Sequence, residues 1–158
     1  MSVLVMGIGN LIMTDDGIGI RAVQLLEERY RFPAEVTVLD GGTLGLELLP
    51  KLEGVAKLLV VDAIETGKPP GTLVRLSGDD VPFALETKVS PHQMGLKDLL
   101  AVASLQGCLP GELVLLGIQP QRVAMGIELS PAVAEQLEPL VARIVKELEQ
   151  WGLAAELL

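Results

Sequence analysis

The chain has 158 residues and is both acidic and apolar, with a formal net charge of −9 and 49% hydrophobic but only 3% aromatic residues. This charge argues against a nucleic-acid partner and against anionic membrane surfaces, because both bind basic patches. The length predicts one domain over residues 1–158, and the single cysteine, Cys108, suits a reducing compartment. We therefore expect a cytoplasmic monomer that has neither a nucleic-acid nor a membrane partner.

The N-terminal part predicts a strand followed by a helix. Residues 3–6 form a continuous apolar run closed by a glycine, which is typical of a central strand covered on both faces. This run is too short for a signal sequence or a membrane span. A helix is expected from about Asp16 to Tyr30, where apolar residues recur at helical spacing, and Thr14 or Asp15 is available as its cap.

The middle of the chain predicts two more buried strands and one edge strand. The buried strands are expected over 35–39 and 57–61, where the residues are mostly apolar. Thr43 can cap a short helix between them, which Pro50 ends or kinks. A glycine- and proline-rich turn then reverses the chain into a shorter, edge-like strand over 72–76.

The C-terminal half completes the alternation of strands and helices. A helix is expected to begin just past His92, and a buried strand follows over 112–118. Ser130-Pro131 is a cap followed by a first-turn proline, and the apolar stripe beyond it predicts a long helix that ends near Leu148. With short, right-handed connections, this order predicts a doubly wound, three-layer α/β sandwich: a mostly parallel, twisted sheet of about five strands with helices on both faces.

Acidic residues stand where the predicted strands end. Asp40 and Asp62 close the second and third strands, and Asp16 follows the first strand after a glycine-rich segment. The carboxyl ends of parallel strands share one edge of an open sheet, so these carboxylates should gather there, with the single histidine, His92, nearby. Carboxylates with one imidazole and no thiolate suit Zn²⁺, Ni²⁺, Mn²⁺ or Fe²⁺ and leave coordination positions open for substrate or water.

The same first segment also has the outline of a dinucleotide site. Gly7 and Gly9 lie between a strand and a helix, as in that motif, but Ile12 takes the position of its third glycine. Asp15 and Asp16 would place two negative charges where the helix start should meet a pyrophosphate. A cation therefore fits this helix start better than a phosphate does.

Each candidate residue also has a purely structural interpretation. Asp15 and Asp16 can be helix-start acids that interact with the helix dipole, and Asp40 and Asp62 can be strand-end acids that accept hydrogen bonds from loop amides. The Gly-Gly pair after Asp40 can be only a turn, and His92 can be a surface or N-cap residue. The convergence of Asp16, Asp40, Asp62 and His92 on one sheet edge favours a functional site.

The sequence resembles the nickel–iron hydrogenase maturation endopeptidases over residues 2–148. The resemblance rests on five blocks in the family's order: Gly7-Ile8-Gly9-Asn10, Asp15-Asp16-Gly17-Ile18-Gly19, Asp40-Gly41-Gly42-Thr43, Val61-Asp62-Ala63 and Ser90-Pro91-His92-Gln93. It implies an endopeptidase that removes a C-terminal extension from the nickel-loaded precursor of the hydrogenase large subunit and recognises the bound nickel. The stretch Ser90-Pro91-His92-Gln93-Met94-Gly95-Leu96 is most similar to members that serve uptake-type hydrogenases.

The resemblance also implies a ligand set. The family's metal ligands fall on Asp16, Asp62 and His92, although many members carry glutamate at the first of these positions. The nickel is carried by the precursor, and other divalent metals such as Zn²⁺ or Cd²⁺ can occupy the site. Asp15 is then expected to be a cap or a solvent-facing charge.

The remaining site residues follow the second strand. Asp40 could serve as a base or orient the metal ligands, and Gly41, Gly42 and Thr43 are the expected substrate-binding residues, because glycine lets a backbone approach a peptide closely. Two other functions stay open from the sequence. One is a self-sufficient metallohydrolase that holds its own zinc, and the other is a non-catalytic Rossmann-like domain that binds a nucleotide or a metal.

Overall fold

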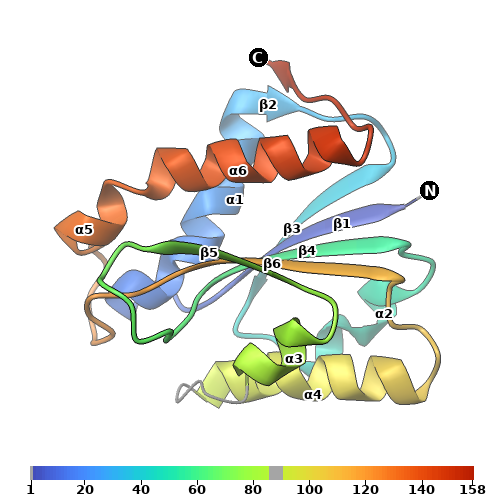
Figure 1. Cartoon of the computed structure of the whole chain (residues 1–158), viewed down its shortest axis with the longest axis horizontal. Coiled ribbons are helices and arrows are strands. Elements are labelled where there is room, and N and C mark those ends of the chain that lie inside the picture. Colours follow the sequence, from blue (N-terminus) through green and yellow to red (C-terminus); the bar gives the residue numbers. More distant parts are fainter. Residues whose placement is uncertain (1, 86–90) are drawn as a thin grey trace.

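A five-stranded sheet in the order β3-β1-β4-β6-β5 forms the middle layer of the protein (Figure 1). The computed structural model describes residues 2–85 and 91–158, and the side chains of residues 2–82 and 96–158. Neighbouring strands pair in parallel except β5, which runs antiparallel to β6 at one edge, as the turn signal predicts. The strands are β1 (Val3–Ile8), β3 (Val36–Gly42), β4 (Lys57–Ala63), β5 (Leu73–Ser77) and β6 (Glu112–Ile118).

Helices cover both faces of this sheet, which confirms the predicted doubly wound sandwich (Figure 1). One face packs against α1 (Ile18–Arg29) and α6 (Leu137–Gln150), and the other against α4 (Pro91–Leu105). The shorter elements are η1 (Thr14–Gly17), η2 (Leu46–Leu48), α2 (Leu49–Leu52), α3 (Asp80–Leu85), α5 (Pro131–Ala134) and the two-stranded ribbon of β2 (Tyr30–Arg31) with β7 (Glu156–Leu157). No helix in the described ranges is long and apolar enough to cross a membrane.

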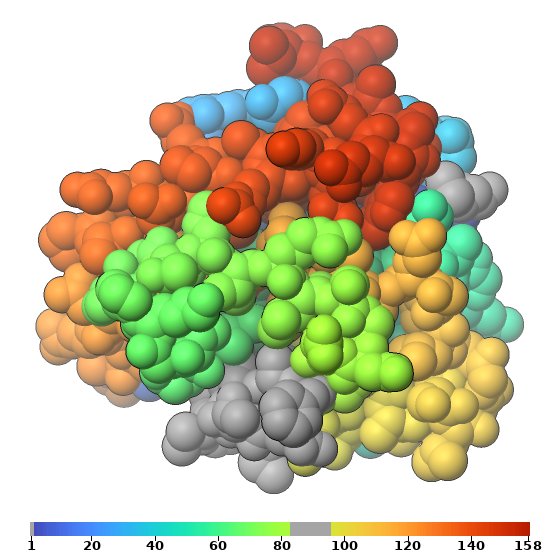
Figure 2. Space-filling model, viewed as in Figure 1, coloured from blue at the N-terminus to red at the C-terminus, as the bar shows by residue number. Residues whose placement is uncertain are grey.

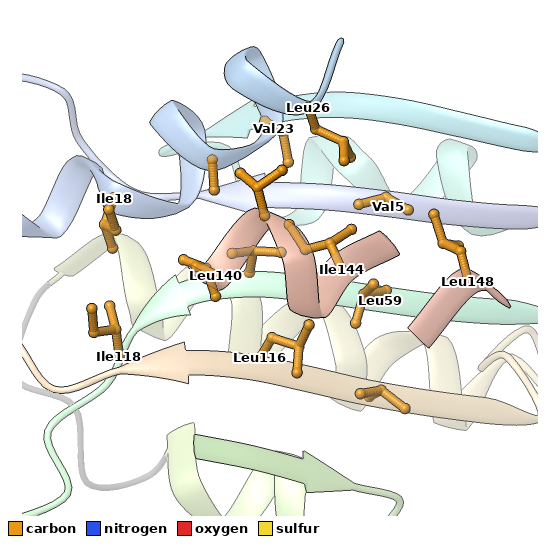
Figure 3. Close-up of a cluster of buried hydrophobic side chains, with 14 of the residues drawn as sticks. Val5, Ile18, Val23, Leu26, Leu59, Leu116, Ile118, Leu140, Ile144 and Leu148 are labelled. Carbon is orange, nitrogen blue, oxygen red and sulfur yellow. The ribbon is translucent and has the colours of Figure 1, made fainter. Parts of the chain in front are cut away.

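Side chains alternate between two hydrophobic cores along each central strand. Val5, Leu59 and Leu116 point toward α1 and α6, where Figure 3 shows them among Leu140 and Ile144. Their sequence neighbours on the same strands belong to the core under α4. Both faces of β1, β4 and β6 are therefore buried, which is why these strands are continuous apolar runs in the sequence.

A glycine brings the start of α1 down onto the sheet. A Cβ atom at Gly19 would lie 2.2 Å from the carbonyl oxygen of Val61 and 2.5 Å from that of Ile8. Such distances are below van der Waals contact, so any side chain at this position would push α1 away from β1 and β4. The turn η1, which precedes α1, also lies against β4.

Several predicted boundaries are wrong by a few residues or more. The helix after β3 begins with η2 after Gly45, so Thr43 does not cap it, and Pro50 lies in the first turn of α2, where its missing N–H is tolerated. The helix expected just past His92 begins at Pro91 and includes His92. The long C-terminal helix is divided at residues 135–136 into α5 and α6.

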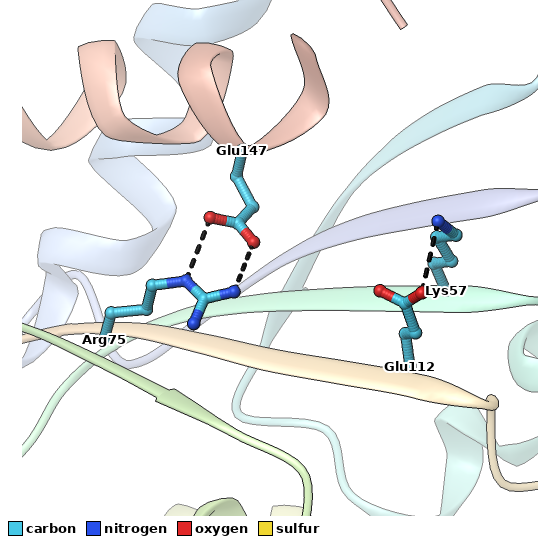
Figure 4. A network of polar contacts seen from close by, with 4 residues as sticks. All are labelled: Lys57, Arg75, Glu112 and Glu147. Carbon is cyan, nitrogen blue, oxygen red and sulfur yellow. Dashed lines mark hydrogen bonds and ion pairs between the residues drawn. The ribbon is translucent and has the colours of Figure 1, made fainter. Parts of the chain in front are cut away.

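Between α6 and β5 lies a cavity of about 590 Å³, bordered by the orange-to-red helix and the green strand in Figure 2. Arg75 of β5 forms a bidentate salt bridge there with the buried Glu147 of α6, with Nε–Oε2 and Nη2–Oε1 distances of 3.0 and 2.7 Å (Figure 4). This hydrogen bonding to Glu147 raises the pKa of the Arg75 guanidinium further above its usual value. The pair fastens α6 to the edge strand.

Replacing Glu147 by glutamine should lower the free energy of unfolding by about 1 kcal/mol. The amide keeps one acceptor but loses the charge, and half-exposed Arg75 can recover water contacts. Thermal unfolding of E147Q beside the matched control E149Q, an exposed carboxylate on the same helix, measures this difference. Equal melting temperatures for the two variants would show that the pair does not stabilise the fold.

Candidate functional site at the carboxyl edge of the sheet

The sheet changes winding direction between β1 and β4. From β1 the chain passes through α1 on one face to β3, whereas α4, on the other face, leads into β6 beyond β4. Connections that leave neighbouring strands toward opposite faces open a crevice at the carboxyl ends of those strands, and ligands bind there in open α/β sheets. The predicted site residues follow β1 and β4 and therefore border this position.

Two of the predicted carboxylates are buried at this edge. Asp16 lies in η1 with 1% of its surface exposed, and its Oδ2 accepts a hydrogen bond from the Asn10 N–H at 3.2 Å. Asp62 lies near the end of β4 with 0% exposed, and its Oδ1 accepts one from the Ala63 N–H at 2.8 Å. By strand alternation Asp62 belongs with Val60 on the face that α4 covers. Both carboxylates therefore accept hydrogen bonds from backbone amides. For Asp62, the purely structural interpretation of the sequence predicted such a bond.

The predicted third ligand, His92, is in the first turn of α4. Figure 1 shows α4 starting on the side of the sheet where β4 and β6 end. The side chain of His92 lies outside the described residues. Within the described side chains, no group of three or more His, Cys, Asp or Glu is arranged to hold a metal ion. Metal binding by Asp16, Asp62 and His92 therefore stays a prediction.

Asp40 and the two glycines after it form a turn at the end of β3. Asp40 is exposed, and its Oδ1 accepts a hydrogen bond from the Gly42 N–H at 3.0 Å. Gly42 has a φ of +53°, which glycine adopts readily, and a Cβ at Gly41 would lie 2.8 Å from the Ile8 side chain. These contacts explain both glycines structurally. Substrate binding by Gly41, Gly42 and the exposed Thr43 stays a prediction.

Gly9 is explained by packing within its own loop. Its φ is +144°, and a Cβ there would lie 1.9 Å from the carbonyl oxygen of Asp16. The loop after β1 thus folds back onto the backbone of η1. The packing of this loop is therefore enough to explain Gly9, and the glycine does not by itself indicate a pyrophosphate site.

Asp15 has a role that the sequence analysis missed. It is fully buried and caps no helix, because Gly17 precedes α1 and no side chain caps that helix, so the expected cap or solvent-facing charge is wrong. Its carboxylate instead accepts four hydrogen bonds from the loop after β6 (residues 119–130). The donors are Gln121 N–H (2.9 Å), Arg122 N–H (2.8 Å), Ser130 N–H (2.7 Å) and Ser130 Oγ (2.8 Å).

Thr14 adds further bonds between the same two segments. Its hydroxyl donates to the Arg122 carbonyl at 2.7 Å and accepts from the Ala124 N–H at 3.1 Å. Its backbone N–H donates to the Gly126 carbonyl, and the Gly126 N–H donates to the Ile12 carbonyl, each at 2.9 Å. Together with Asp15, these bonds join the loop after β1 to the loop after β6 at the carboxyl edge.

Comparison with known proteins gives one consistent result. A model of the hydrogenase maturation protease family matches residues 20–147. The hydrogenase 2 maturation protease of Escherichia coli is 40% identical over 156 residues, covering 98% of this chain and 95% of that protein. The hydrogenase expression/formation protein HupD of Rhodobacter capsulatus is 46% identical over 153 residues, covering 96% of this chain and 73% of that protein.

Solved structures give the same result for the fold. The hydrogenase maturating endopeptidase HybD from E. coli superposes with a TM-score of 0.96 at 39% sequence identity, covering 99% of this chain and 98% of that one. The maturation protease HybD from Thermococcus kodakarensis has a TM-score of 0.76 at 31% identity, covering 94% and 99% of the two chains. The predicted fold and the resemblance stated from the sequence are both confirmed.

Proposed function

This chain belongs to the hydrogenase maturation protease family and is therefore a peptide hydrolase, and we propose that it removes a C-terminal extension from the precursor of the nickel–iron hydrogenase large subunit. The observation that carries this proposal is the match to the E. coli hydrogenase 2 maturation protease over nearly the whole of both chains. The substrate is then a folded protein with an extended tail.

We further propose that Asp16, Asp62 and His92 complete the coordination of nickel that the precursor already holds. Two buried carboxylates and an imidazole from the start of α4 are a donor set that binds Ni²⁺. A cation also offsets the cost of keeping two carboxylates buried at one sheet edge. Because the precursor supplies the metal, the same residues need to bind free metal only modestly.

The chemistry is hydrolysis of one peptide bond. Asp16, Asp62 and His92 would hold the nickel of the precursor beside the tail, where the metal would supply polarisation of a carbonyl or activation of a water. Water adds to the carbonyl carbon and gives up a proton to a base, the C–N bond breaks, and the base returns that proton to the leaving nitrogen. Asp40, exposed at the end of β3, is the proposed base that accepts the proton lost by water, or it orients the ligands.

Nickel-loaded precursor should be trimmed, whereas nickel-free precursor should stay uncut. Mass measurement of the large subunit after incubation with the purified protein distinguishes the two forms directly. Adding Ni²⁺ to the protease alone, without loading the precursor, is the control. Equal trimming of both precursors would exclude nickel as the recognised feature, and stoichiometric zinc in the purified protein would then support a self-sufficient zinc hydrolase.

A further inference from the structure

Exposed apolar side chains gather on the segments that follow β1, β3 and β6. Of the ten large hydrophobic side chains that are exposed in the described part of the chain, six lie on these three segments. The six residues, which we call the apolar rim, are Ile12, Leu44, Leu46, Val123, Met125 and Ile127. Exposed apolar residues that lie close together mark interaction surfaces, whereas single scattered ones do not.

The same segments are nearly free of charge. The stretches that carry the rim residues, 9–14, 42–46 and 119–127, contain a single charged side chain, Arg122, although 21% of the whole chain is charged; exposed Asp40, Glu47 and Glu128 border them. The centres of protein interfaces are depleted in charged residues. An apolar partner surface can therefore cover the rim residues themselves while burying few charged side chains.

Two of the three segments are held rigidly. Met13 forms a parallel bridge with Gly126, which sets Ile12 opposite Met125; Met125 and Ile127 are 81% and 68% exposed. The hydrogen bonds that Thr14 and Asp15 form with the loop after β6 hold the same two loops together. Next to Met125 and Ile127 is a cavity of about 580 Å³. A preorganised surface loses little conformational entropy when a partner binds.

We propose that the apolar rim is the surface on which the folded body of the precursor docks while its tail enters the site. This inference rests on the proposed function for the identity of the substrate. The rim is continuous with the predicted site, because η1 carries both Thr14, which bonds the β6 loop, and Asp16, the predicted ligand. A second copy of this chain bound here would cover the edge that the substrate must reach, so the occupant is the precursor.

The rim is tested by M125S and I127S in steady-state cleavage of nickel-loaded precursor. Each substitution should raise KM about tenfold and leave kcat within about twofold of wild type, because the lost contact serves binding alone. Thermal unfolding should not change, since both side chains are in solvent in the free protein. The matched control is L105S, an equally apolar and 87% exposed residue at the end of α4.

Binding without cleavage separates this inference from the proposed function. In an H92A background, M125S and I127S should weaken the affinity for uncut precursor about tenfold, and L105S should not. If both rim variants keep the wild-type KM and the wild-type affinity, the rim is not the docking surface, and the proposed function is unaffected. If the wild-type protein is a dimer, and M125S makes it monomeric without changing KM, the rim is a dimer interface and the docking proposal is wrong. Failure of the wild-type protein to cut loaded precursor would instead overturn the proposed function.

Discussion

Replacing His92 by alanine should abolish removal of the C-terminal extension and change the free energy of unfolding by no more than about 1 kcal/mol. The imidazole is the one nitrogen donor in the predicted ligand set, since the chain has a single histidine. His92 lies in the first turn of α4, and the helix is fixed to the sheet by Leu96, Leu99 and Leu100 further along. Loss of the predicted ligand should therefore remove nickel contact while the helix stays packed through these leucines.

Metal binding provides a measurement that does not depend on cleavage. Calorimetric titration of the purified protein with Cd²⁺ or Zn²⁺ should show at least about tenfold weaker binding in H92A, the loss expected when one of three ligands is removed. S104A, an exposed position on the same helix, should bind and cleave like wild type. An H92A protein that trims loaded precursor at the normal rate would show that the imidazole is not a ligand of the nickel.

The sequence predicted the sheet well because its central strands are buried on both faces. Continuous apolar runs such as 3–6, 58–61 and 113–116 are buried on both faces in an α/β sandwich, and all three lie in strands. Short elements that depend on tertiary contacts were not predicted. The ribbon of β2 and β7 pairs Tyr30 and Arg31 with residues near the C-terminus, and the six residues of α3 are too few for a periodic pattern.

The candidate site was predicted in position more than in detail. Strand ends and topology were enough to bring Asp16 and Asp62 to the edge between β1 and β4, because parallel strands end together. The partners of Asp15 could not be found in this way. They lie 106 to 115 residues further along the chain, in a loop with no periodicity, so local spacing gives Asp15 only the general preferences of a helix-start acid.

Replacing Asp15 by asparagine should lower the free energy of unfolding by about 3 kcal/mol and strongly reduce processing. The carboxylate is fully buried and only accepts hydrogen bonds, whereas asparagine offers one oxygen and an NH₂ group. With its oxygen placed toward Gln121 and Arg122, the NH₂ group would face the Ser130 N–H, donor against donor. Losing charge-assisted bonds in a buried position costs about 1.5–3 kcal/mol for each bond.

The loss of processing follows from what Asp15 holds in place. When the bonds to Ser130 are lost, the loop after β6 is held less tightly to η1, and the apolar rim and the neighbouring Asp16 are positioned less firmly. Thermal unfolding and amide hydrogen exchange at residues 121, 122 and 130 measure the loosening, and E27Q, an exposed carboxylate on α1, is the control. If D15N has the melting temperature and the processing rate of wild type, the carboxylate does not hold the loop. The bonds made by Thr14 would then be sufficient to keep the two loops together.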